Sequence, residues 1–154
     1  MSVFISFEGG EGCGKTTQAS LLRERLKQMG VPALLVREPG TTELGKDLRK
    51  LLKAPKKTYS YEAELLLFAA ARAELVKEVI GPALKQGMII IADRYADSSV
   101  AYQGYGRGLD IDLIRRVNQF VTQGVVPDLT VLLDIDPREG LQRLRTQQSR
   151  LPLE

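Results

Sequence analysis

The segment that most constrains the fold of this chain is residues 9–16, Gly-Gly-Glu-Gly-Cys-Gly-Lys-Thr. It matches the complete phosphate-loop pattern G-x-x-x-x-G-K-[ST], and it lies between an apolar run at 3–7 and an amphipathic stretch. Glycines let such a loop turn its backbone N–H groups inward, and the positive end of the following helix dipole faces the same point. This context favours a nucleotide-phosphate site over the alternative, a chance glycine-rich turn.

Three side chains of this loop have different expected roles. Lys15 has the reach to contact the β and γ phosphates of a bound nucleotide, and the Thr16 hydroxyl is placed to ligate Mg²⁺. Cys13 is either a reactive thiol or a small filler of the loop, and we expect the filler.

Composition limits the classes of function that remain. With 154 residues, 44% of them apolar and 27% charged, the chain fits one soluble domain over 1–154. The 22 basic and 19 acidic residues give a net charge of +3, so we expect no nucleic-acid partner. No apolar stretch is long enough to predict a membrane span, and no signal-type leader is recognisable, so we expect a cytoplasmic protein.

Two rare residue types narrow the chemistry further. The single cysteine excludes an internal disulfide, and the absence of histidine removes histidine triads, bases and metal ligands. Phosphoryl transfer remains possible, because lysine, arginine and Mg²⁺ supply most of its catalysis.

Apolar β-rich runs alternate with helical patterns along the chain. The runs are 3–7, 33–36, 88–92 and 129–133; the helical patterns are 15–29, 42–53, 61–86 with a possible break at Pro82, 110–122, and a last one from near Pro137. Gly30 and Gly87 are expected to end helices, and Asp110 to cap one. The alternation predicts a three-layer α/β fold around a parallel sheet, with ligands at the carboxyl ends of the strands.

The residues that follow these strands suggest which ligands bind at the carboxyl ends. REPG at 37–40 and DRY at 93–95 place arginines at the carboxyl ends, together with Asp93 and Asp134. An enzyme that phosphorylates a phosphate must hold a second anionic group, for which guanidinium groups are suited, whereas a GTPase has no such need. Phe68 and Arg72 are one helical turn apart, so both could approach one flat ring.

Together these segments resemble thymidylate kinase, the bacterial type closely, from residue 3 to about residue 151. The resemblance is carried by FEGGEGCGKTT at 7–17, REPG at 37–40, LLLFAAAR at 65–72, DRYADSSVAYQGYGRG at 93–108 and PDLTVLLDIDP at 127–137. It implies the P-loop NTPase fold of a nucleoside monophosphate kinase. It also implies transfer of the γ-phosphoryl group of ATP to dTMP, giving dTDP, with Mg²⁺ and in a homodimer.

On the donor side, the resemblance implies contacts with the ATP phosphates from Gly10, Glu11, Gly12, Cys13, Gly14, Lys15, Thr16 and Thr17. Lys15 would stabilise the transferred charge as a catalytic residue. Thr16 would lie near the metal, and Asp93 would reach the metal through water.

On the acceptor side, the resemblance implies that Phe68 stacks on thymine, Arg72 bonds a thymine carbonyl, and Ser99 and Gln103 lie near the base edge. Arg37, Arg49 and Arg94 would contact the acceptor phosphate, with Arg94 also catalytic; Glu11 would bind the sugar 3′-hydroxyl and Tyr102 would crowd out a ribose 2′-hydroxyl.

Several of these residues also have purely structural interpretations. Phe68 could be a core residue, and Tyr102 could be an ordinary half-buried aromatic residue. Arg49 could be an exposed helix charge, and Glu38 could be a local ion-pair partner. The remaining four could be helix caps: Ser98 and Ser99 of the next helix, and Asp134 and Asp136 of the helix near Pro137.

Some family members carry an arginine in the phosphate loop where this chain has Gly12, so a lid must supply it. Residues 140–151 resemble that lid, in which Arg150 is the best match for the catalytic arginine, with Arg145 and Arg143 as neighbours. The family continues through a further strand and a closing helix, so we expect both to be missing here, whether because the chain is a fragment or because those residues are disordered.

Three other functions stay open at this level. They are a kinase of the same architecture for another nucleotide or nucleoside, a phosphate-loop ATPase that is regulatory or linked to nucleic acid, and a non-catalytic dimerisation fragment.

Overall fold

A computed structural model describes residues 2–54 and 59–148 of the chain. The elements, in chain order, are β1 (Val3–Gly9), α1 (Lys15–Gln28), β2 (Ala33–Arg37), α2 (Glu43–Lys53), α3 (Tyr61–Leu75), η1 (Val76–Ile80), α4 (Gly81–Lys85), β3 (Ile89–Asp93), α5 (Ala96–Ser99), η2 (Val100–Gly106), α6 (Ile111–Thr122), β4 (Leu129–Leu133) and α7 (Pro137–Gln148).

The strands form one parallel sheet in the order β2-β3-β1-β4. In its register Asp93 of β3 lies opposite both Phe7 of β1 and Arg37 of β2. The carboxyl ends of these strands therefore meet at one edge, directly before the loop that joins β1 to α1. This confirms the predicted parallel sheet and places the candidate residues of three strands together.

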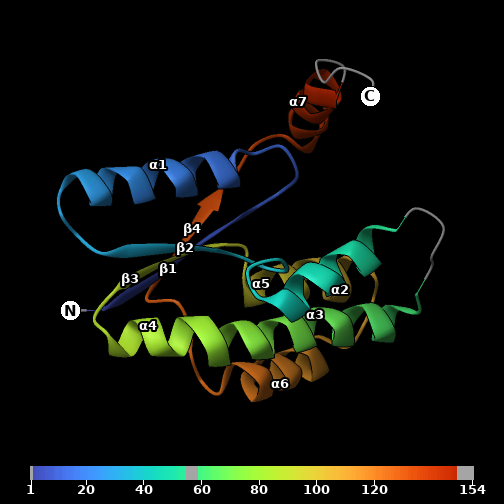
Figure 1. Cartoon of the computed structure of the whole chain (residues 1–154). Helices are drawn as coiled ribbons and strands as arrows, with labels where there is room; N and C mark the ends of the chain where they lie inside the picture. The colour runs from blue at the N-terminus through green and yellow to red at the C-terminus, as the bar shows by residue number, and fades with distance from the viewer. Residues whose placement is uncertain (1, 55–58, 149–154) are drawn as a thin grey trace.

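Helices cover both faces of the sheet, as Figure 1 shows, with α1 on one side and α3, α4 and α6 on the other. Because strand side chains alternate between faces, each face has its own apolar cluster. Phe7 and Ile91 pack with Ala19 of α1, whereas Phe4 and Ile90 pack with Ile80 on the opposite side. The three-layer α/β fold predicted from the sequence is confirmed.

Helix ends are also where the sequence predicts them. The Asp110 carboxylate accepts the Leu113 N–H at 2.8 Å and so caps α6, and the Asp136 carboxylate accepts the Arg138 N–H at 2.7 Å at the start of α7. Gly30 and Gly87 have φ angles of 71° and 78° after α1 and α4, a conformation that glycine adopts without strain.

At Pro82, where the sequence allows a break, the structure has a widened helical turn just before the proline. Proline has no N–H to donate and its ring crowds the carbonyl one turn earlier. The chain accommodates it through the π-helical segment η1, in which the Gly81 N–H bonds back to the Val76 carbonyl, and helical structure continues into α4.

A second difference concerns the segment after β3. Residues 96–106 form α5 and η2, which the sequence did not predict because Ser and Gly interrupt its apolar pattern. The alternative interpretation, that Ser98 and Ser99 cap the next helix, is wrong, since both belong to α5 and Asp110 caps α6.

Candidate active site

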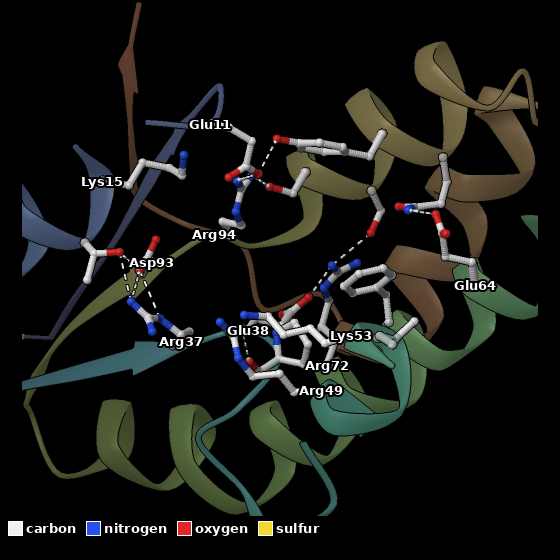
Figure 2. A pocket seen from close by; sticks show the side chains of 18 of the residues that line it. Glu11, Lys15, Arg37, Glu38, Arg49, Lys53, Glu64, Arg72, Asp93 and Arg94 are labelled. Atoms are coloured by element: carbon white, nitrogen blue, oxygen red, sulfur yellow. Dashed lines mark hydrogen bonds and ion pairs between the residues drawn. The ribbon is translucent and has the colours of Figure 1, made fainter. Parts of the chain in front are cut away.

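A cavity of about 550 Å³ opens at the carboxyl edge of the sheet. Figure 2 shows it from close by, with Lys15 toward one end and Glu64 toward the other. Its lining includes fifteen of the residues predicted from the sequence: Glu11, Gly12, Gly14, Lys15, Thr16, Thr17, Arg37, Arg49, Phe68, Arg72, Asp93, Arg94, Ser99, Tyr102 and Gln103. Residues from the phosphate loop, α2, α3 and η2, far apart in the chain, thus face one space.

The phosphate loop has the geometry that its glycines predict. Gly12 and Gly14 have φ angles of 71° and 97°, and Gly14 leads directly into α1, whose N-terminus faces the cavity. The Lys15 ammonium is buried in the loop, where it donates to the carbonyl of Gly10 at 2.6 Å and of Gly9 at 3.0 Å. A lysine, an amide-lined turn and a helix N-terminus together favour phosphate groups.

Helix α7 packs against this loop at a contact that only glycine permits. A Cβ at Gly12 would collide with the carbonyl of Gly140, and a Cβ at Gly140 would collide with the carbonyl of Glu11. The family's alternative arginine at position 12 therefore has no room in this chain.

Two oxygen donors predicted for a metal lie together at the end of β3. The Thr16 hydroxyl donates to Asp93 Oδ2 at 2.6 Å, and the Arg37 guanidinium donates to the same Asp93 oxygen at 3.0 and 3.2 Å and to Thr16 Oγ1 at 2.9 Å. Mg²⁺ typically takes one or two protein oxygens and completes its shell with water and phosphate, so this donor pair fits it. Among the described residues, no group of three His, Cys, Asp or Glu side chains forms a fuller metal site.

Arg94 has an unusual backbone conformation for a residue with a side chain. Its φ is 76°, and its N–H donates to the Phe7 carbonyl at 3.1 Å. The guanidinium turns toward the phosphate loop, where it donates to Glu11 Oε1 at 2.5 Å and lies 5.1 Å from the ring centre of Tyr102. The Tyr102 hydroxyl donates to the same Glu11 oxygen at 3.1 Å, so these three predicted residues form one cluster.

Glu8, which the sequence analysis did not single out, supports this cluster. Its buried carboxylate accepts the Tyr95 N–H and the Ser98 hydroxyl, both at 2.7 Å. Burial raises the pKa of Glu8, although these two hydrogen bonds act in the opposite direction. The one sequence signal is an acidic residue at the buried end of the first strand.

Arg72 is held in a buried network of side chains that meet from four segments. It is 1% exposed, and it donates to Asn118 Oδ1 at 2.5 Å, to Ser99 Oγ at 2.9 Å, and to the carboxylate of Glu38. Glu38 was considered as a local ion-pair partner, but its partner is this distant arginine. Burial raises the pKa of the Glu38 carboxyl, and the charge of Arg72 opposes that shift.

The remaining predicted side chains also face the cavity. Phe68 is half-buried and lines the cavity, so it is not an interior core residue. Arg49 donates to the Pro39 carbonyl at 3.0 Å, and burial lowers its pKa, so it is not a free helix charge. Gln103 is buried and donates to Glu64, an acidic lining residue that the sequence analysis missed.

The residues assigned to a lid lie only partly within the described residues. Residues 140–148 belong to α7, Arg150 lies outside the described residues, and Arg145 is exposed and lines neither cavity described here. Arg143 pairs with Glu139 and lines a second cavity of about 650 Å³ between α7 and the phosphate loop.

Two predicted residues of the phosphate loop lie near Lys15. Cys13 lines the second cavity and is buried, with its Sγ 3.4 Å from Lys15 Nζ. Gly10 contributes a carbonyl that accepts a hydrogen bond from Lys15.

Known proteins match both the sequence and this architecture. The family model described as thymidylate kinase matches residues 7–153. A thymidylate kinase of Halothermothrix orenii is 52% identical over 143 residues, which cover 93% of this chain and 69% of the relative. One of Synechococcus sp. is 54% identical over 153 residues, which cover 97% and 74% respectively. A crystal structure of thymidylate kinase from Ehrlichia chaffeensis superposes with a TM-score of 0.83 at 45% identity, covering 96% of this chain and 85% of that one.

Proposed function

The chain belongs to the thymidylate kinase family, and from this membership we propose how its cavity transfers a phosphoryl group from ATP to dTMP. The single observation that supports the scheme is the content of one cavity, in which an amide-lined loop with Lys15 faces a group of arginines. The loop suits one set of phosphates, and Arg37, Arg49 and Arg94 suit a second.

The donor half of the scheme uses the phosphate loop. Residues 10–17 hold the ATP phosphates through backbone N–H groups, and Lys15 contacts the oxygens on which charge develops. Thr16 and Asp93 would hold Mg²⁺, which supplies neutralisation of phosphate charge when bound. Lys15 already lies where the loop carbonyls of Gly9 and Gly10 fix its ammonium group.

The acceptor half uses the arginine cluster. Arg94 is directed at the space beside the phosphate loop, and Arg37 and Arg49 approach it from β2 and α2. Together they hold the dTMP phosphate in line with the donor, so that positioning provides most of the rate. No general base is needed, because the attacking group is already an anionic oxygen.

The nucleoside half of the acceptor lies toward α3 and η2. Phe68 stacks on the thymine ring, Arg72 donates to a thymine carbonyl, and Ser99 and Gln103 complete the base edge. Glu11 binds the sugar 3′-hydroxyl, and Tyr102, whose hydroxyl already contacts Glu11, leaves no room for a ribose 2′-hydroxyl.

The wider context is proposed on the same basis. Arg150 or Arg145 enters from the lid with ATP, and the protein acts as a cytoplasmic homodimer with nucleotides as its only substrates. No helix among residues 2–54 and 59–148 is long and apolar enough to cross a membrane.

The direct test is ADP formation from ATP and Mg²⁺ with dTMP, dUMP, dCMP or thymidine as acceptor. We expect turnover that depends on dTMP, with thymidine inactive because it has no phosphate for the arginines to hold. ATP hydrolysis that is equal with and without dTMP would contradict the proposal.

A further inference from the structure

Gln103 lies in the part of the cavity proposed for the base, and chemistry fixes which way its amide faces. The residue is 3% exposed, and its Nε2 donates to Glu64 Oε1 at 2.7 Å. An ionised carboxylate accepts hydrogen bonds and donates none, so the nitrogen end of the amide must face Glu64. The oxygen end is therefore the one that remains for a ligand in the cavity.

Glu64 is itself held from a second side. Arg107 donates from Nε to Oε1 and from Nη2 to Oε2 of Glu64, both at 3.4 Å, and its guanidinium lies 5.3 Å from the ring centre of Tyr61. Glu64 and Arg107 both line the cavity, and Figure 2 shows Glu64 near its end away from Lys15. Glu64 thus connects η2, which carries Gln103, to the first turns of α3.

We infer that Glu64 is a positioning residue that makes the cavity select pyrimidines with an N–H at ring position 3. The inference rests on the proposed function, which places a pyrimidine between Phe68, Arg72 and Gln103. Thymine and uracil carry a donor at N3, which the Gln103 oxygen accepts. Cytosine carries an acceptor there, so two lone pairs would face one another in a desolvated site.

Arg72 also favours thymine over cytosine, through the neighbouring ring position. A guanidinium only donates hydrogen bonds, so it pairs with the carbonyl at C4 of thymine and not with the amino group at C4 of cytosine. Arg72 needs no help to present donors, whereas a glutamine amide has a donor end and an acceptor end. The choice between a donor and an acceptor facing N3 is therefore the one that a neighbouring side chain decides.

The test is Glu64→Gln, which keeps the side-chain size and replaces the acceptor-only group with an amide. Gln103 then pairs with its neighbour in either orientation and presents its nitrogen to the base part of the time. We expect the ratio of dissociation constants for dCMP and dTMP, measured by calorimetry, to fall about tenfold. The ratio for dUMP and dTMP should not change, since both bases have an N3–H.

Two further variants separate this role from a structural one. Glu62→Gln makes the same change on an exposed side chain two residues earlier, nearer the positive end of the α3 dipole, and should keep the wild-type ratio. The exchange Glu64→Gln with Gln103→Glu conserves charge and puts an acceptor-only group beside the base. It should restore preference for dTMP to within about threefold of wild type.

The results of these measurements separate failure of the inference from failure of the proposed function. An unchanged dCMP to dTMP ratio in a folded Glu64→Gln variant would overturn the inference, and so would loss of the dTMP preference in the exchanged pair. If Glu64→Gln fails to fold, by circular dichroism, the exchanged pair decides alone. Wild-type protein that binds none of the three nucleotides would instead overturn the proposed function.

Discussion

At the scale of single residues, Arg94 shows how the fold orients a side chain that we propose holds the acceptor phosphate. A left-handed backbone at a residue with a side chain costs roughly 1–2 kcal/mol. Here the Phe7 carbonyl and the Glu8 carboxylate hold the N–H groups of Arg94 and Tyr95. The resulting turn sends the Arg94 side chain back over the phosphate loop to Glu11.

The first prediction concerns the buried carboxyl of Glu8. Because burial raises its pKa, the folded state binds this proton more tightly than the unfolded state. The free energy of unfolding should therefore fall as the pH rises from about 4.5, the ordinary value, through the folded-state pKa. In Glu8→Gln the amide oxygen still accepts the Tyr95 N–H, and this fall should become smaller in urea unfolding measured at several pH values, with the part due to Glu38 retained. Glu62→Gln should keep the wild-type profile, and a variant at Glu8 that also keeps it would refute the assignment.

A second residue-level prediction concerns Asn118, which contacts Arg72 without lining the cavity. Its Oδ1 accepts from Arg72, and its Nδ2 donates to the Ala96 carbonyl at 3.2 Å. Asn118→Ala leaves a buried guanidinium N–H unpaired, which should lower the free energy of unfolding by about 1–3 kcal/mol. Because Arg72 is then less well fixed, dTMP should bind about tenfold more weakly while the KM for ATP stays the same. Asn118→Asp keeps the acceptor and should retain most dTMP affinity; equal losses for both nucleotides would indicate a general structural role.

At the scale of elements, α7, the last helix of the described residues, contacts the phosphate loop, which we propose holds the ATP phosphates. Gly12 and Gly140 approach so closely that neither has room for a Cβ. The second cavity lies beside this contact, between the loop and Arg143 of α7. Movement of α7 would therefore first alter the shape of the part of the cavity that we propose for ATP.

Gly140→Ala tests this coupling. The added methyl group meets the Glu11 carbonyl, so α7 must shift away from the loop at a cost of about 1–3 kcal/mol. We expect the KM for ATP to rise about tenfold while the dissociation constant for dTMP, by calorimetry, changes little. Leu141→Ala, at an exposed position of the same helix, is the matched control. A selective loss of dTMP binding would contradict the predicted coupling.

The elements also show what the sequence can and cannot predict. Local apolar patterns predict the strands, the parallel sheet and the layers around it. Capping residues and motifs predict the helix caps and the residues of the cavity. Glu38, Glu64 and Asn118 could not be assigned their partners, because Arg72 and Gln103 meet them only through tertiary packing. The helical turns at 96–106 were missed because tertiary contacts, and not apolar periodicity, stabilise them. The lid assignments stay predictions.

At the scale of the whole molecule, β2 and β4 are the edge strands of the sheet in the described residues, and β4 exposes large apolar side chains. Strand β4 pairs only with β1, and Leu129 and Leu132 on it are 53% and 67% exposed. An exposed apolar edge strand is a template for pairing with another chain.

We therefore expect this chain to associate as its concentration rises, through β4. Leu132→Lys should weaken that association in sedimentation velocity, because a charged edge opposes strand pairing. It should leave dTMP binding unchanged, since β4 does not line the nucleotide cavity. Leu21→Lys, at a leucine on α1 that is 58% exposed, serves as the control. Association that is identical in wild type and Leu132→Lys would place the contact elsewhere.

The central claim is that one cavity holds two phosphate groups end to end, one on the loop and one on the arginines. Calorimetry with adenosine and thymidine joined through a polyphosphate chain measures this directly. If both subsites are adjacent, the joined ligand should bind at one site per chain and about 10²–10⁴ times more tightly than ATP or dTMP alone. Binding no tighter than that of ATP alone would contradict the account.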